Sequence, residues 1–221
     1  MKKLIFIIAL LISLLFFIFC LTSTSYAQIN SQELDTLVEE AMSKFNVAGV
    51  AIAIVKDGAI IHNKGYGVKS ATSKEKVNEH TQFAIASNSK AFTTTALALL
   101  VEEAKITWQD KVVDHIPEFK MYNAYVTENF NIQDLLTHRS GLGLGIGDLM
   151  FFPDGSDFTI DDLLSSFQHF KPQSAFRTKF DYDNLLYLVA GEIIARKSGL
   201  TWEKFIKTRI MKPLHMDNSY P

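Results

Sequence analysis

The first regular pattern of apolar and polar positions in the chain is that of an amphipathic helix. Asn30 and Glu33 have the spacing of a capping box. Apolar residues then recur at helical spacing, at Leu34, Leu37, Val38 and Ala41. This pattern predicts a helix that begins next to Asn30 and ends near Phe45.

The pattern then changes to one that is typical of strands. Residues 48–55 form a continuous run of small and β-branched residues, and a second such run begins at Ala59. Asp57 and Gly58 lie between the two runs and form a dipeptide that tight hairpin turns prefer. We therefore predict a hairpin whose second strand ends near Gly65 and Gly67.

Most of the remaining chain has helical periodicity. The residues from Ser87 to Ala104 are mostly apolar helix formers, which predicts a buried helix. Cap residues predict further helices, with starts at Asn131, Thr159, Asn184 and Thr201 and, for the last two, ends near Lys197 and Ile210. A two-stranded hairpin does not normally stand alone as a sheet under so many helices. We therefore expect an α+β protein whose sheet is completed by strands that these 221 residues do not contain.

The start of the chain has the layout of an export signal. Lys2 and Lys3 precede an apolar run over residues 4–21, and small residues occupy the −3 and −1 positions of a cleavage site after Ala27. This predicts a signal peptide over residues 1–27 and an exported protein, periplasmic or secreted. Because a bilayer is spanned by roughly 20 apolar residues, a retained membrane anchor over residues 4–21 is the alternative.

Composition excludes several classes of protein. The net charge is −2, and no basic stripe with interleaved aromatic residues occurs, so nucleic acid is not an expected partner. The single cysteine, Cys20, lies in the N-terminal apolar run, so the mature chain has no disulfide and no thiolate nucleophile. The six histidines form no His-x-x-x-His pair, and we expect no metal and no other cofactor.

Ser87 and Lys90 are the first candidates for chemistry. Residues three apart lie on one face of a helix, so the hydroxyl and the amine can approach each other. A helix start also favours the negative charge that develops on an attacking oxygen. A serine with such a neighbour can be a nucleophile for acyl transfer, although an ordinary helix cap has the same spelling. Ser73 and Lys76 repeat the spacing in a polar stretch, which we interpret as a solvated loop.

Tyr182 and Asn184 form a second candidate pair, immediately before a predicted amphipathic helix. A tyrosine held near a lysine ammonium can exist partly as phenolate, and can then take up and return a proton. An asparagine amide can orient a substrate carbonyl or the lysine. Taken alone, this pair has a structural alternative, namely a buried tyrosine followed by a capping asparagine.

Together these residues resemble the serine β-lactamase and penicillin-binding protein superfamily, for which Ser-x-x-Lys is a signature. The resemblance is to the branch with a Tyr-x-Asn second motif, which includes class C β-lactamases, D,D-carboxypeptidases, D-aminopeptidases and esterases. It extends from about residue 31 to residue 221. The similar segments are residues 83–93, 135–142, 180–194 and 213–216, with Arg139 and His215 where the family commonly has threonine and glycine.

The resemblance implies the β-lactamase/transpeptidase-like fold, an α/β sandwich. It implies hydrolysis of an amide or ester bond in a β-lactam, a D-amino peptide or an ester, through an acyl-enzyme on Ser87. Lys90 would assist proton transfer, Tyr182 would be the general base, and Asn184 would contact the substrate. His138 is expected to be structural, and the acidic segment over residues 148–162 is a candidate lining of the cleft.

One motif of this family does not occur in the sequence. No Lys-Thr-Gly or His-x-Gly follows Tyr182, although the family carries this third motif on a strand that lines the site. We therefore expect residues 28–221 to be the N-terminal portion of such a hydrolase domain. An inactive fragment, or a remnant that only binds, is the alternative to an active enzyme. An α/β-hydrolase is disfavoured because the chain has no Gly-x-Ser-x-Gly.

Overall fold

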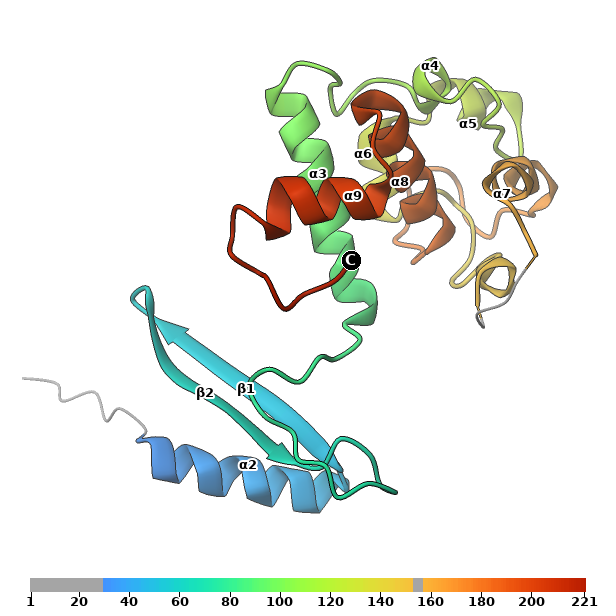
Figure 1. Cartoon of the computed structure of the whole chain (residues 1–221). Helices are drawn as coiled ribbons and strands as arrows, with labels where there is room; N and C mark the ends of the chain where they lie inside the picture. Colours follow the sequence, from blue (N-terminus) through green and yellow to red (C-terminus); the bar gives the residue numbers. More distant parts are fainter. Residues whose placement is uncertain (1–29, 153–156) are drawn as a thin grey trace, which may run out of the picture. The chain divides into compact units, whose positions relative to one another are not determined.

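The computed structural model describes residues 30–152 and 157–221. The chain divides after Thr81 into two units, which are described separately here (Figure 1). The predicted signal peptide lies outside the described residues. Among the described residues, no helix combines the length and the apolar character that crossing a bilayer requires.

In the first unit, helix α2 (Ser31–Phe45) runs beside a β-hairpin (Figure 1). The helix begins at the predicted capping box, in which the Asn30 side chain accepts from the Glu33 N–H and the Glu33 carboxylate accepts from the Asn30 N–H. Two side chains of the second strand bond to Asp35 on the helix, Lys64 at 2.7 Å and Tyr66 at 2.6 Å. These bonds fix one face of the helix against the hairpin.

The hairpin consists of β1 (Gly49–Lys56) and β2 (Ala59–Gly67), which pair antiparallel. Its turn lies at Asp57 and Gly58, both of which have positive φ. The predicted hairpin is therefore confirmed, with a register shift between Ile54 and Val55 that the sequence pattern did not indicate.

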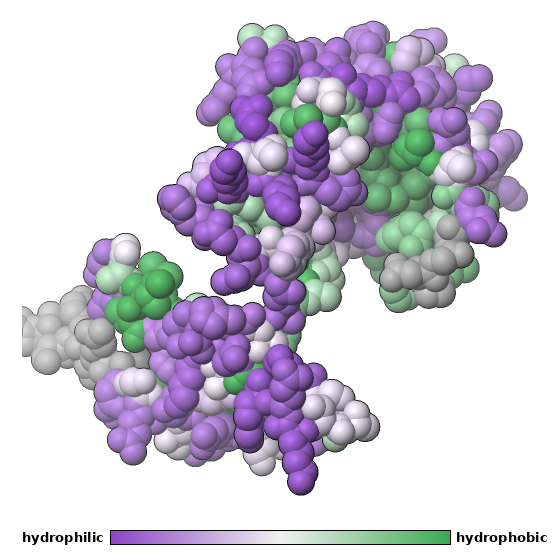
Figure 2. Space-filling view, in the orientation of Figure 1, coloured by the Kyte–Doolittle hydropathy of each residue, from purple (hydrophilic) through white to green (hydrophobic). Residues whose placement is uncertain are grey.

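Large apolar side chains are exposed on the hairpin. Val55 and Ile60 are 64% and 69% exposed, and Ile61 is exposed as well. Figure 2 shows hydrophobic atoms gathered at the turn end of the hairpin. Among the described residues of the first unit, α2 is the only helix beside the two strands.

The second unit is helical. Its α-helices are α3 (Ser89–Glu102), α4 (Val112–His115), α5 (Ala124–Asn129), α6 (Ile132–Thr137), α7 (Ile160–Ser166), α8 (Leu185–Ser198) and α9 (Trp202–Ile206). Short 3₁₀ turns lie at Ala86–Asn88 (η1), Asp148–Met150 (η2) and Phe167–His169 (η3), and a π-turn at Lys207–Met211 (η4) follows α9. The predicted cap residues Asn131 and Thr159 open α6 and α7, and each forms a capping box.

Two predicted helices differ in detail from the structure. The helix expected from Ser87 begins at Ser89, and Ser87 itself lies in the 3₁₀ turn η1. The helix expected from Thr201 to Ile210 is α-helical only to Ile206 and continues as the π-turn. In that last segment the Thr208 hydroxyl donates to the carbonyl of Lys204 at 2.7 Å. A side-chain bond of this kind competes with the regular helix ladder.

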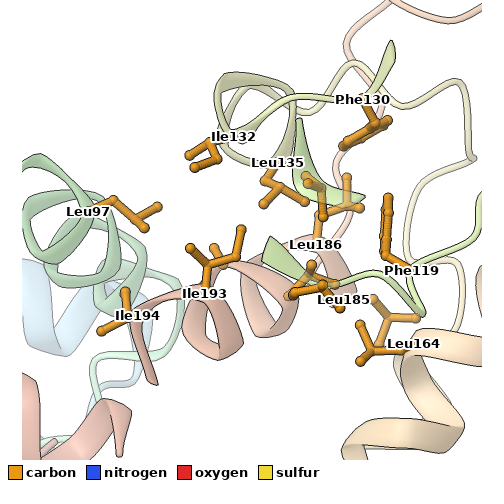
Figure 3. Close-up of a cluster of buried hydrophobic side chains, with 14 of the residues drawn as sticks. Leu97, Phe119, Phe130, Ile132, Leu135, Leu164, Leu185, Leu186, Ile193 and Ile194 are labelled. Carbon is orange, nitrogen blue, oxygen red and sulfur yellow. The ribbon is translucent and has the colours of Figure 1, made fainter. Parts of the chain in front are cut away.

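The core of the second unit brings α3 and α8 together. Figure 3 shows Leu97 of α3 near Ile193 and Ile194 of α8, with Leu135 of α6 beside them. Burying such side chains contributes about 1.5–3 kcal/mol each. The indole N–H of Trp202 in α9 also donates to the Thr93 hydroxyl in α3 at 3.0 Å. The two helices that adjoin Ser87 and Asn184 are thus held next to each other by the core.

Candidate active site

Ser87 lies in a strained turn, η1, immediately before the start of α3. The residue before it, Ala86, has a φ of 44°, in the left-handed region that residues with a side chain rarely adopt. Ser87 is exposed, and its Oγ lies 3.3 Å from the Nζ of Lys90. The turn therefore presents the hydroxyl at the surface of the unit, next to the amine.

Lys90 contacts all of the other predicted site residues. Its Nζ donates to the Asn184 Oδ1 at 2.6 Å and to the Ser87 Oγ at 3.3 Å. The same Nζ lies 4.8 Å from the ring centroid of Tyr182 and 5.1 Å from that of Tyr187. An ammonium at such distances is attracted by the faces of both rings.

The side chain of Tyr182 contacts that of Ser87. Its phenol oxygen lies 2.6 Å from the Ser87 Oγ. Burial raises the pKa of Tyr182, but the bonds with Lys90 and Ser87 and the charge of Lys90 outweigh that effect, so the pKa is lowered overall. A lowered pKa makes the phenolate more accessible near neutral pH, as a general base requires.

Asn184 does not cap the helix that it precedes. Its side chain makes no cap bond to α8, and Asp183 instead accepts the N–H of Leu185 at 3.0 Å. The amide of Asn184 is placed between two charged groups, with Oδ1 on Lys90 and Nδ2 on both carboxylate oxygens of Asp148, at 3.1 and 3.2 Å. The structural alternative of a capping asparagine is therefore contradicted for this residue.

A glycine-rich loop places Asp148 beside Asn184. The N–H of Gly145 donates to the carbonyl of Tyr182 at 3.1 Å. Gly147 has a φ of +73°, and a Cβ on it would lie 2.2 Å from the Leu185 Cδ1. Only glycine allows the loop to approach the start of α8 this closely.

His138 holds the segment that carries Tyr182 with both its backbone and its ring. Its carbonyl accepts the N–H of Asp181 at 2.7 Å, and its Nδ1 accepts the N–H of Asp183 at 3.2 Å. The ring stacks on that of Tyr182, with 4.5 Å between centroids. Burial, and then the charge of Lys90, lower the pKa of His138, which favours the neutral ring that such a bond needs. These contacts agree with the predicted structural role.

Asp183 is a buried carboxyl between the two motif residues. It is 0% exposed, and its Oδ2 has no hydrogen-bond partner among the described residues. Burial raises the pKa of Asp183 to about 7, although backbone N–H groups of Leu185 and Leu186 act in the opposite direction. A carboxyl in this environment holds its proton through the mildly acidic range.

Replacing Asp183 with asparagine should therefore reduce the dependence of the free energy of unfolding on pH. The unfolded carboxyl releases its proton near about pH 3.9, whereas the folded one holds it to about pH 7. The folded state binds more protons in this window, so its stability is highest below it and falls as the pH rises, by up to about 1.4 kcal/mol per pH unit. We expect the free energy of unfolding, measured with urea at several pH values in this window, to fall more steeply with pH for the wild type than for the variant.

The control for this measurement is Asp161→Asn, which removes an exposed carboxylate from the first turn of α7. This variant should show the same slope of unfolding free energy against pH as the wild type. Equal slopes for the wild type and Asp183→Asn would contradict the prediction.

The structure brings all four predicted site residues together, and all four belong to the second unit. Asp148 and Tyr187 were not among the predicted site residues, although Asp148 begins the acidic segment that was expected to line the cleft. The position of Tyr187, one helical turn after Asn184, is the sequence feature that could have indicated it. Within residues 30–152 and 157–221, no group of three or more His, Cys, Asp or Glu side chains could hold a metal ion.

The sequence of the chain is similar to those of known proteins. The family model described as Beta-lactamase matches residues 34–220. The chain is 32% identical over 205 residues to Protein flp of Staphylococcus aureus, an alignment that covers 86% of this chain and 38% of that protein. It is 29% identical over 199 residues to Unguisins hydrolase ungD' of Aspergillus campestris, covering 86% of this chain and 36% of that one.

Solved structures confirm the predicted fold class. The octameric penicillin-binding protein homologue from Pyrococcus abyssi matches with a TM-score of 0.73 and 26% identity, over 86% of this chain and 44% of that one. A class C β-lactamase matches with a TM-score of 0.71 and 26% identity, over 84% of this chain and 49% of that one. The chain thus has the β-lactamase/transpeptidase-like α+β fold, and spans less than half the length of these proteins.

Proposed function

The chain belongs to the Beta-lactamase family, and on that premise we propose that it is part of a serine hydrolase that forms an acyl-enzyme on Ser87. The observation that carries this proposal is the convergence of two groups on one hydroxyl. The Ser87 Oγ lies 2.6 Å from the phenol oxygen of Tyr182 and 3.3 Å from the Nζ of Lys90. A nucleophile that touches a proton acceptor within hydrogen-bonding distance is the arrangement that covalent catalysis needs.

The proposed reaction has two steps. In the first, the Oγ of Ser87 attacks the carbonyl carbon of an amide or ester while its proton passes to the Tyr182 oxygen. That proton then goes to the departing amine or alcohol as the bond to the carbonyl carbon breaks. In the second, a water attacks the acyl-enzyme, Tyr182 takes the proton of that water, and the proton returns to the Ser87 Oγ as the acid is released.

Lys90 and Asn184 have supporting roles in this proposal. Lys90 stabilises the phenolate of Tyr182 and hydrogen-bonds to the Ser87 Oγ. Asn184 holds Lys90 through its Oδ1, and we propose that it also contacts the substrate. The backbone N–H of Ser87 is proposed as one donor of an oxyanion hole, a contribution of roughly 2.7–4 kcal/mol to the transition state.

Covalent labelling of the protein at its complete natural length tests the proposal. The probes are a fluorescent penicillin and a fluorophosphonate, and the adduct is located by mass spectrometry of the digested protein. We expect both the wild type and the Ser73→Ala variant to carry the label at Ser87, and Ser87→Ala to carry none. Absence of label on the wild type with both probes, or label on Ser87→Ala, would reject the acyl-enzyme.

The substrate class is proposed only as an amide or ester, namely a β-lactam, a D-amino peptide or a simple ester. The same acyl-transfer centre serves all three, and the choice between them is made by the walls of the pocket. Hydrolysis rates of the wild type on a chromogenic cephalosporin, a D-Ala-D-Ala peptide and a nitrophenyl ester distinguish them. One relative is named Unguisins hydrolase, so unguisins are a further class of molecule whose hydrolysis is named among the relatives.

We further propose that the protein works outside the cytoplasm. Lys2, Lys3 and the apolar run over residues 4–21 support export, and the small residues before Gln28 support cleavage there. N-terminal sequencing of the protein recovered from outside the cytoplasmic membrane should begin at Gln28. An intact N-terminus on membrane-bound protein would indicate a retained anchor instead.

A further inference from the structure

We propose that Asp148 is a positioning residue, whose carboxylate fixes the amide of Asn184 so that its carbonyl oxygen faces Lys90. This inference rests on the proposed function, because Lys90 is the group that the amide holds in place. Asp148 is half-buried, and both of its carboxylate oxygens lie within hydrogen-bonding distance of the Asn184 Nδ2, at 3.1 and 3.2 Å.

The orientation of the amide follows from the chemistry of its two neighbours. An ionised carboxylate can only accept hydrogen bonds, and an ammonium can only donate them. With Asp148 on one side and Lys90 on the other, only one orientation satisfies both: Nδ2 on Asp148 and Oδ1 on Lys90. The reversed amide would place its oxygen against a carboxylate and its NH₂ group against an ammonium. The carboxylate therefore selects the amide orientation that gives Lys90 its shortest hydrogen bond, at 2.6 Å.

Asp148, Asn184 and Lys90 form a series of hydrogen bonds, although the three side chains come from separate parts of the sequence. Asp148 comes from the turn η2, Asn184 from the start of α8, and Lys90 from the first turn of α3. Hydrogen bonds in such a chain polarise and strengthen one another when the chain is shielded from water. Since Lys90 also touches the Ser87 Oγ and lies over the Tyr182 ring, a fixed amide restricts where the ammonium can be.

The loop that carries Asp148 is built around this contact. Its Gly145 N–H is bound to the Tyr182 carbonyl, and Gly147 packs where a Cβ would meet Leu185. Residues on both sides of Asn184 along the chain are thus tied to the loop. The loop brings Asp148 to Asn184 with little freedom to move away.

Three substitutions at residue 148 test the proposal in the protein at its natural length. Asp148→Ala removes the acceptor, Asp148→Asn keeps an acceptor oxygen but removes the charge, and Asp148→Glu keeps the charge on a longer arm. Asp161→Asn is the control for the loss of one negative charge, because it is exposed and lies in the same unit. Melting temperatures establish that each variant is folded.

The first readout is the rate of labelling by the fluorophosphonate. Displacement of a catalytic group by about 1 Å can cost roughly a hundredfold in rate. We expect Asp148→Ala to be slower by that order, Asp148→Asn and Asp148→Glu to recover part of the rate, and Asp161→Asn to match the wild type. If Asp148→Ala labels at the wild-type rate, or Asp148→Asn is as slow as Asp148→Ala, the proposal is overturned while the acyl-enzyme stands.

The second readout does not depend on activity. The side-chain NH₂ of Asn184 gives a pair of NMR signals, which can be assigned by their loss in Asn184→Asp. We expect this pair to be protected from exchange with water in the wild type and Asp148→Asn, and to lose that protection in Asp148→Ala. Unchanged signals in Asp148→Ala overturn the positioning role, even if the wild type is not labelled and the proposed function itself fails.

Discussion

Replacing Lys90 with methionine should slow the labelling of Ser87 by about a hundredfold to ten-thousandfold, the range that a positioned acid or base contributes. The methionine side chain fills similar space, but it cannot donate to the Ser87 Oγ or to the Asn184 Oδ1. The proton transfer from Ser87 would then lose the cation that stabilises its acceptor.

The same substitution should move the remaining activity to higher pH. Burial and the charge of Asp148 raise the pKa of Tyr182, and the interactions with Lys90 and Ser87 outweigh them. Without Lys90 the raising effects predominate, so the phenolate forms only at higher pH. The acidic limb of the plot of labelling rate against pH should therefore shift upward.

Two further measurements make this prediction specific. The ultraviolet absorbance of the phenolate, taken as the difference from Tyr182→Phe, should titrate at higher pH in Lys90→Met than in the wild type. Lys76→Met is the matched control, because Ser73-x-x-Lys76 has the same spacing but lies outside any helix, in the first unit, with Lys76 exposed. An unchanged pH profile in Lys90→Met would contradict the assigned role of the lysine.

Removing the buried carboxylate of Asp134 should lower the free energy of unfolding by about 1.5–3 kcal/mol, the contribution of hydrogen bonds to a charged group, because Arg177 is 38% exposed and can be solvated once the carboxylate is gone. The side chain of Asp134 is 1% exposed and accepts from both Nε and Nη2 of Arg177, at 2.9 and 2.6 Å. It also accepts the N–H of Asn131 at the start of α6. Asp134→Ala would leave the guanidinium without its carboxylate and the helix start without half of its capping box.

The matched control is Arg196→Ala, which breaks an ion-pair group at the surface. Arg196 pairs with Glu118 and Glu192, and all three side chains are partly exposed. Such pairs contribute about 1 kcal/mol or less. Urea unfolding followed by helical circular dichroism should therefore show a large loss for Asp134→Ala and a small one for Arg196→Ala. Similar losses in the two variants would show that the Arg177 pair is no more than a surface contact.

The sequence was sufficient to predict those elements whose ends are defined by local interactions. The capping boxes at Asn30, Asn131 and Thr159 each involve residues three apart, and all three are present in the structure. The Asp57-Gly58 turn is equally local. The π-turn after α9 and the register shift in β1 could not be predicted, because they depend on packing and on single side-chain bonds.

The same distinction applies to the site. The Ser-x-x-Lys and Tyr-x-Asn spacings, and the similarity that they support, were enough to select Ser87, Lys90, Tyr182 and Asn184. The contact between Asp148 and Asn184 could not be predicted. Glycine alternates with leucine or isoleucine over residues 141–147, and this pattern does not indicate the path of the loop that the structure forms there. The role of Asp134 was hidden in a similar way. Its spacing indicated a helix cap, whereas its partner Arg177 lies in a loop far along the chain.

The lowered pKa of His138 affects the pH range over which the site keeps its native structure. An ordinary histidine gains a proton as the pH falls through about 6.5. A protonated ring would lose the lone pair that receives the Asp183 N–H. Because burial and the neighbouring ammonium lower the pKa of His138, the ring stays uncharged to a lower pH than an ordinary imidazole does. The segment that carries Tyr182 therefore keeps its hydrogen bond to the imidazole down to a lower pH than it would if the ring were exposed to solvent.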